Sequence, residues 1–133
     1  MKTNILQLSL RWMICALGTL ALTAAAAPPV VKTVPWVASN PLIPHSTYSG
    51  KTTRLKGTCD QQGANFQWTW DFGDGSPVAT GTVTDRYVIE ASHAYSGVAG
   101  TVFTARLTVQ DTSTGETGNR VYFVAIQDRT LEV

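Results

Sequence analysis

The sequence has little cysteine and little charge imbalance, and each shortage argues against a class of protein. Only two of its 133 residues are cysteines, too few for the disulfide framework of a small secreted scaffold. Ten basic and nine acidic residues give a net charge of +1, with no basic stripe to neutralise the phosphates of a nucleic acid. Two histidines beside so few cysteines also argue against a zinc site. We therefore expect a fold held by packing and no nucleic-acid partner.

One long apolar run, residues 12–22, lies near the N-terminus and has the features of a signal peptide. Lys2 and Arg11 supply the positive charge before it, and the alanines at 24–27 supply small residues for cleavage. About a dozen apolar residues are too few for a membrane helix, which needs about 20, although an N-terminal anchor is the alternative. We expect residues 1–26 to be removed on export, Cys15 among them, leaving no membrane span. The destination is then the periplasm, the cell surface or the medium, and the alanine-rich leader suggests a bacterial source.

The remainder of the chain has the size of one small domain. Eight basic and nine acidic residues remain after cleavage, so the charge stays close to neutral. Residues 27–43 are rich in proline and lack periodicity, which predicts an extended linker. We place one domain at 44–127, followed by a tail or the start of another linker at 128–133. Cys59, the one cysteine left, has inward parity and is expected to be a small buried residue, although an exposed reactive thiol is the alternative.

Alternating apolar and polar residues indicate strands and no helix. The alternation predicts strands at 52–59, 66–72, 82–90, 101–111 and 120–127, separated by turn residues. Short strands at intervals of roughly ten residues are typical of an all-β sandwich or barrel. The last strand is apolar on both faces, so it should be central or covered. In the second strand, four aromatic residues share one face: Phe66, Trp68, Trp70 and Phe72.

Three motifs follow one another along these strands. The aromatic strand runs directly into an acidic, glycine-rich turn, where glycine supplies positive φ and aspartate bonds to the local backbone. A His-x-Tyr step comes later, and a glycine then precedes an alternating strand that ends in aspartate. The motifs are Trp70-Asp71-Phe72-Gly73-Asp74-Gly75, His93-Ala94-Tyr95, and Gly100 followed by residues 101–111 with Asp111 at the end.

Together these motifs resemble the PKD (polycystic-kidney-disease-like) domain family, whose fold is an immunoglobulin-like β-sandwich. The resemblance covers about residues 44–127. The sequence departs from the family pattern at Thr58-Cys59-Asp60 and in a long segment at 77–93. The resemblance implies a module without catalytic activity, in which the acidic motif is structural and His93 and Tyr95 pack and form hydrogen bonds. It also implies a secreted or surface-exposed spacer or adhesion module that contacts a protein partner or neighbouring domains. The alternative is a carbohydrate-binding accessory module of a secreted hydrolase.

The aspartates leave two chemical alternatives open. Asp71 and Asp74 could form a carboxylate pair for acid–base chemistry, although such a pair needs a cleft between its members. Calcium needs six to eight oxygen ligands, and Asp60, Asp71, Asp74 and Asp111 are the candidates for it. Otherwise no cofactor is expected. If the motif is instead structural, the carboxylate of Asp71 should accept the backbone amides freed by Gly73 and Gly75.

Two further hypotheses concern other side chains. Cys59 and His93 could form a thiol dyad if the thiol were accessible, which its inward parity argues against. Trp36, Trp68 and an outward-facing Tyr122 could form an aromatic platform for a sugar or a partner chain, although core packing is the simpler interpretation of Trp68. A strand at a sheet edge could also pair with a neighbouring domain.

Overall fold

The computed structural model describes residues 26–129, and nearly all of them belong to a β-sandwich. The predicted signal peptide (1–26), apart from Ala26, and residues 130–133 of the predicted tail lie outside the described residues. Within the described part of the chain, no helix is long and apolar enough to span a membrane.

Eight strands and one short 3-10 helix make up the described chain. Three of the strands predicted from alternation begin and end within a residue of the expected positions, and the last begins three residues earlier than expected. The elements are β1 (Val31–Val34), η1 (Trp36–Ser39), β2 (His45–Tyr48), β3 (Thr52–Cys59), β4 (Phe66–Asp71), β5 (Ala79–Thr82), β6 (Ile89–Ala94), β7 (Val102–Asp111) and β8 (Thr117–Gln127).

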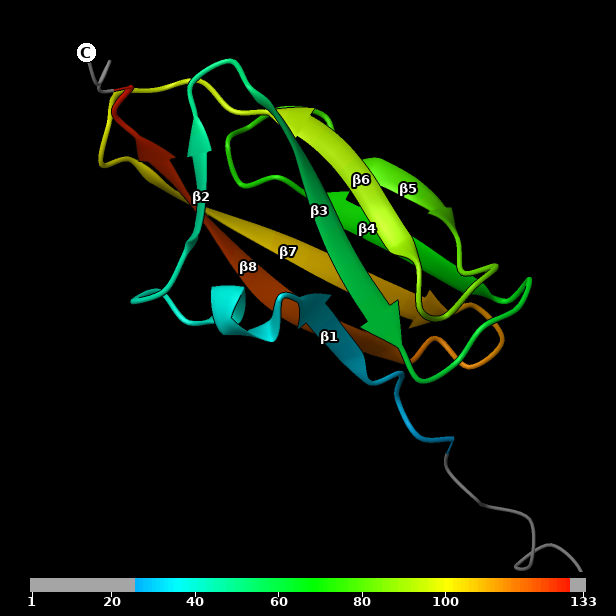
Figure 1. The fold of residues 1–133 in the computed structure, drawn as a ribbon. Coiled ribbons are helices and arrows are strands. Elements are labelled where there is room, and N and C mark those ends of the chain that lie inside the picture. Colours follow the sequence, from blue (N-terminus) through cyan, green and yellow to red (C-terminus); the bar gives the residue numbers. More distant parts are fainter. Residues whose placement is uncertain (1–25, 130–133) are drawn as a thin grey trace, which may run out of the picture.

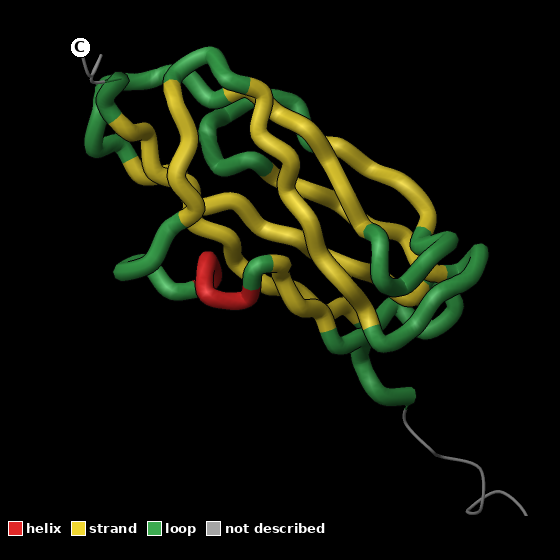
Figure 2. The backbone as a smooth tube through the Cα atoms, in the orientation of Figure 1, coloured by secondary structure: helices red, strands yellow, loops and turns green. Residues whose placement is uncertain are grey.

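The strands form two sheets that pack face to face (Figures 1 and 2). The first has the order β1-β3-β6 and the second the order β2-β8-β7-β4-β5. All neighbouring strands are antiparallel except β2 and β8, which are parallel. β8 therefore lies between two other strands, which confirms the central position expected from its two apolar faces. The all-β sandwich predicted from the sequence is confirmed.

The proline-rich segment is part of the sandwich, so the prediction of a linker at 27–43 was wrong. Strand β1 pairs with β3, with Val31 opposite Cys59 and Val34 opposite Lys56. Val31 and Thr33 point into the sandwich and are buried, whereas Lys32 and Val34 point outward. The alternation extends over only four residues between prolines, too short a stretch to be recognised as a strand. The chain then passes through η1 to β2, which joins the other sheet.

The single strand predicted at 82–90 was also wrong, because the structure has two strands there with a loop between them. β5 ends at Thr82 and β6 begins at Ile89. In the loop, the Asp85 carboxylate accepts the Tyr87 amide at 2.9 Å, and the Asp85 carbonyl accepts the Val88 amide at 3.1 Å. These bonds to the local backbone compete with a strand ladder, and they leave Tyr87 exposed.

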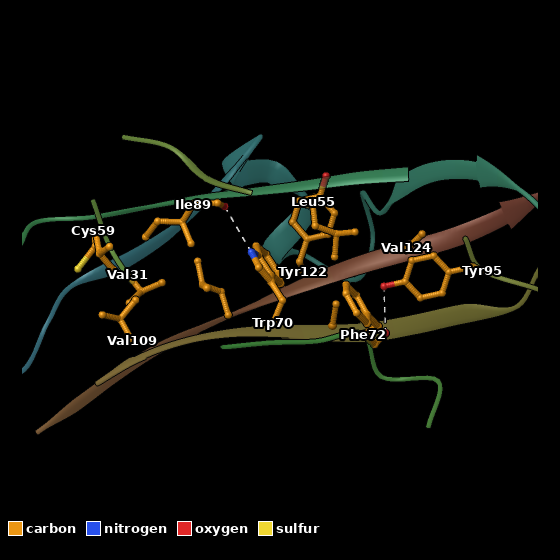
Figure 3. Packing of buried hydrophobic residues seen from close by; sticks show 14 of the residues in the cluster. Val31, Leu55, Cys59, Trp70, Phe72, Ile89, Tyr95, Val109, Tyr122 and Val124 are labelled. Atoms are coloured by element: carbon orange, nitrogen blue, oxygen red, sulfur yellow. Dashed lines mark hydrogen bonds between the residues drawn. The ribbon is translucent and has the colours of Figure 1, made fainter. Parts of the chain in front are cut away.

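The core is built around Trp70, which lies between the two sheets (Figure 3). Its indole Nε1 donates to the carbonyl oxygen of Ile89 on the opposite sheet at 3.3 Å. Its ring meets Tyr122 edge to face, with centroids 6.1 Å apart. Tyr122 is therefore buried at 0% exposure, and the prediction that it faces outward was wrong. The reason is that Tyr122, Val124 and Ile126 form the face of β8 that covers the core.

Candidate functional site

The acidic turn follows β4 and is closed by its own first aspartate. Asp71 Oδ1 accepts the backbone amide of Gly73 at 2.9 Å, the kind of bond expected from the sequence. Gly73 has a φ of 75°, and a side chain there would overlap the carbonyl of Thr104. Glycine is therefore required at this position both for its backbone conformation and for its close approach to β7. The expected bond to the Gly75 amide is not formed, because Asp74, the second aspartate of the turn, accepts the amide of Ser76 instead.

Asp74 ties the turn to the other sheet. Its Oδ1 accepts the backbone amide of Ser76 at 3.1 Å, and its Oδ2 lies 2.6 Å from Nε2 of His93 on β6. The carboxylate side chain is only 15% exposed. Burial by itself would raise the pKa of Asp74, but the hydrogen bonds from Ser76 and His93 outweigh it and lower the pKa. The charged carboxylate is thus the form that this arrangement stabilises.

An aromatic stack continues the connection into the core. The His93 ring lies parallel to Phe72, with centroids 4.1 Å apart, and perpendicular to Tyr95 at 4.7 Å. The Tyr95 hydroxyl donates to the carbonyl oxygen of Phe72 at 3.0 Å in a buried position (Figure 3). Burial raises the pKa of Tyr95, so the hydroxyl keeps its proton and remains a donor. Phe72 follows β4 and Tyr95 follows β6, so this bond also joins the two sheets.

The side chains Ser76, His93 and Asp74 include the residue types of a hydrolytic triad, but their geometry differs from one. Ser76 Oγ lies 3.3 Å from His93 Nε2, the same nitrogen that Asp74 contacts at 2.6 Å. In a triad the carboxylate holds one ring nitrogen so that the other is free to take the proton of the serine. Here one nitrogen serves both partners, and Ser76 Oγ also donates to Asp74. The arrangement is suited to bridging two sheets and not to activating a nucleophile.

The four calcium candidates do not come together. Asp71 and Asp74 lie at one end of the sandwich, whereas Asp111 is opposite Phe66 at the far end of β4. Asp60 follows β3, where it accepts the Val30 amide at 2.8 Å. Asp111 accepts the amide and hydroxyl of Ser113, and these bonds lower the pKa of Asp111. Among residues 26–129, no three His, Cys, Asp or Glu side chains are grouped so that they could hold a metal ion.

The thiol dyad is likewise not formed. Cys59 is buried, as its parity predicted, and lies opposite Val31 at one end of β3. His93 is opposite Thr53 at the other end of the same strand. Burial raises the pKa of the Cys59 thiol, which disfavours the reactive thiolate.

The predicted aromatic platform does not form either. Trp36 is 75% exposed, but Tyr122 is buried in the core. Trp68 is partly buried against the core, and its indole lies so close to Gly81 that an added Cβ would come within 2.6 Å of it. Trp36 is therefore the one member of the three that offers an open ring.

Sequence reasoning missed the contact between Asp74, in the turn after β4, and His93, which lies 19 residues away on β6 of the other sheet. It also missed a groove beside β1 that includes Arg120, because β1 itself was not recognised. The sequence signal for the Asp74–His93 contact was that an acidic turn and a His-x-Tyr step occur in the same chain. For the groove, the alternating Val31, Lys32 and Thr33 gave a weak signal.

Comparison with known proteins rests on structure. No protein-family model matches the sequence, and no curated protein matches it. Among solved structures, the chain is similar to the PKD domain of an M14-like peptidase from a Thermoplasmatales archaeon. That similarity has a TM-score of 0.51 and 18% sequence identity, and it covers 79% of this chain and 100% of that one. With the two sheets and the acidic turn described above, it shows that the chain has the fold of a PKD domain, an immunoglobulin-like β-sandwich.

Proposed function

We propose that this chain is a non-catalytic module of an exported protein, which serves as a spacer and adhesion unit and contacts a protein partner or neighbouring domains. The observation that carries the proposal is that the aspartates of the acidic turn form hydrogen bonds within the sandwich. Asp71 and Asp74 are bound to Gly73, Ser76 and His93, and the bonds of Asp74 join the two sheets. A rigid sandwich whose polar motif serves its own stability is suited to mechanical separation and docking, and not to catalysis.

Exposed apolar side chains support a role in contact. Several large ones lie between the end of β1 and the start of β2, on either side of η1 in the sequence. A set of exposed apolar residues on one segment favours association with another surface. These residues are Val34, Leu42 and Ile43, which are between 43% and 87% exposed.

Export is part of the proposal and rests on the sequence of residues 1–26, with positive charge, an apolar run and alanines at the cleavage site. Fusing residues 1–30 to a reporter tests it. Export and cleavage near residue 26 are expected, and retention of an uncleaved, membrane-attached reporter would contradict this part of the proposal.

Adhesion is tested with beads that carry the purified protein. We expect the beads to bind to the surface of the source cells or their matrix, and this binding to be lost when that surface is first treated with protease. Beads carrying a Trp70→Ala variant, whose core is disrupted, serve as the control for folding. Binding that survives protease but not glycan oxidation would favour the carbohydrate-binding alternative, and absence of binding would refute the adhesive role.

A further inference from the structure

A groove of about 430 Å³ lies along the edge of β1, beside β8 and η1. Consecutive residues of the β1 segment line it, with side chains that point to both faces of the sheet. The groove therefore follows the edge of the strand and not one face. Figure 1 shows β1 and η1 side by side, next to the first half of β8. The lining residues are Val30, Val31, Lys32, Thr33, Trp36 and Arg120.

Polar backbone groups face this groove. β1 is an edge strand, and within the described chain β3 is its one neighbour in the sheet. The Asp60 amide donates to the Val30 carbonyl at 3.1 Å, so Val30 is a position whose backbone groups face β3. In an antiparallel pair such positions recur at every second residue, and the residues between them face the other way. The N–H and C=O groups of Val31 and Thr33 therefore point away from β3. The hydroxyl of Thr33 is also buried without a hydrogen-bond partner among residues 26–129.

The groove has two positively charged side chains in its lining, of which Lys32 also borders an adjoining pocket that contains Asp60. Lys32 and Arg120 line it, and its lining includes no carboxylate. In the described part of the chain neither cation forms an ion pair, and Arg120 donates only to the Ser39 hydroxyl, at 3.1 Å. The neighbouring cations Arg54 and Lys56, by contrast, share Glu90 at 3.8 and 3.7 Å. An anionic ligand would therefore find two donors in this groove that form no ion pair with the described residues.

Trp36 adds an apolar ring to these charges. It is the first residue of η1, beside the groove, and is 75% exposed, so its ring is presented to solvent. An indole ring combines a broad apolar face with a polar edge, a combination common at binding surfaces. The C–H face of a pyranose ring can stack on such a ring while its acidic substituent reaches a neighbouring cation.

We propose that this groove binds an acidic polysaccharide, with a carboxylate or sulfate on Arg120 and Lys32 and a sugar ring on Trp36. An acidic peptide fits less well. β1 has only four residues, and only Val31 and Thr33 turn their backbone groups outward, so an added peptide strand would form few main-chain bonds. Apolar peptide side chains also require concave pockets, whereas Trp36 is a flat exposed ring. Sugar hydroxyls can use single donors and acceptors. This inference goes beyond the protein contact proposed above and does not depend on it.

Affinity electrophoresis of the purified protein tests the proposal in gels that contain a polymer. Polygalacturonate supplies carboxylates and dextran sulfate supplies sulfates, while dextran is the neutral control and poly-glutamate the acidic peptide. We expect retardation by at least one acidic polysaccharide, and little by dextran or poly-glutamate. Trp36→Ala and Arg120→Gln should each weaken binding about tenfold or more. Arg120→Lys, which keeps the charge, should retain part of it.

Arg54→Gln is the matched control, since it removes one positive charge from the neighbouring strand, outside the groove, where Arg54 forms an ion pair with Glu90. It should leave binding within about twofold of the unaltered protein. An equal loss in Arg54→Gln and Arg120→Gln would reveal unspecific charge attraction and overturn the proposal. So would equal or tighter binding of poly-glutamate, equal binding of dextran, or no binding of either acidic polysaccharide. Circular dichroism of each variant shows that the sandwich is intact.

Discussion

Replacing Tyr95 by phenylalanine removes one buried hydroxyl and tests whether the turn is tied to the opposite sheet. The hydroxyl donates to the Phe72 carbonyl at 3.0 Å, and Tyr95 is 0% exposed. Without this donor, the carbonyl oxygen of Phe72 stays buried but no longer accepts this hydrogen bond. The change adds no atoms, so strain does not enter the comparison.

The expected loss follows from the cost of leaving a buried acceptor unpaired. That cost is about 1–3 kcal/mol, larger than the net gain from an average hydrogen bond. Each kcal/mol lowers the melting temperature of a domain of this size by about 4–8 °C. Tyr95→Phe should therefore melt at least about 4 °C below the unaltered protein.

Tyr122→Phe provides a matched control within the same core. Tyr122 is also 0% exposed, but its hydroxyl has no hydrogen-bond partner among the described residues. Removing an unpaired buried hydroxyl should leave stability unchanged or raise it by up to about 1 kcal/mol. Urea unfolding of both variants, with equal m-values, measures the difference. Equal losses in the two variants would refute the assignment of the Tyr95 bond as the connection between turn and sheet.

Three further predictions concern the turn and the buried thiol. The pKa of Asp74 is lowered in the folded state, so its carboxylate stabilises the fold above the unfolded pKa of about 3.9, and this stabilisation is lost as the pH falls through the folded pKa. Asp74→Asn should therefore lower the free energy of unfolding by about 1–2 kcal/mol at pH 7. Urea titrations at several pH values should also show that its stability changes less below pH ~4 than that of the unaltered protein. Gly73→Ala should cost about 2–3 kcal/mol of stability in thermal unfolding, because the added Cβ meets the Thr104 carbonyl. Gly75 has a φ of 81° and open space around it, so Gly75→Ala should cost only about 1 kcal/mol. Equal costs would refute the close approach of Gly73 to Thr104. Cys59, which is buried, should react with a thiol reagent only as fast as the protein unfolds, and rapid labelling of the folded protein would contradict its position.

Strands with clear alternation were predictable because burial of one face imposes a period of two. β3 occupies the predicted residues, and β4 and β7 lie within one residue of them. β1, β2 and β5 have four residues each, so their period does not stand out from the surrounding turns. Their places depend on tertiary pairing, which local patterns do not contain.

The turn was only partly predictable for the same reason. The Asp71–Gly73 bond spans two residues and follows from local turn chemistry. The Asp74–His93 contact depends on how the sheets face each other, and the inward position of Tyr122 depends on which face of β8 the core uses. A strand that is apolar on both faces gives no signal to decide between them.

Thermal unfolding of the purified protein with calcium and with chelator tests the central claim most directly. The account holds that the aspartates of the turn serve the fold by binding the chain's own amides and His93, and not by holding a metal ion. A ligand that binds only the folded state raises the melting temperature by mass action. We predict superimposable unfolding curves in calcium and in chelator. A reproducible rise of several degrees in calcium, lost in Asp71→Asn or Asp74→Asn, would contradict the structural role and make the turn a metal site.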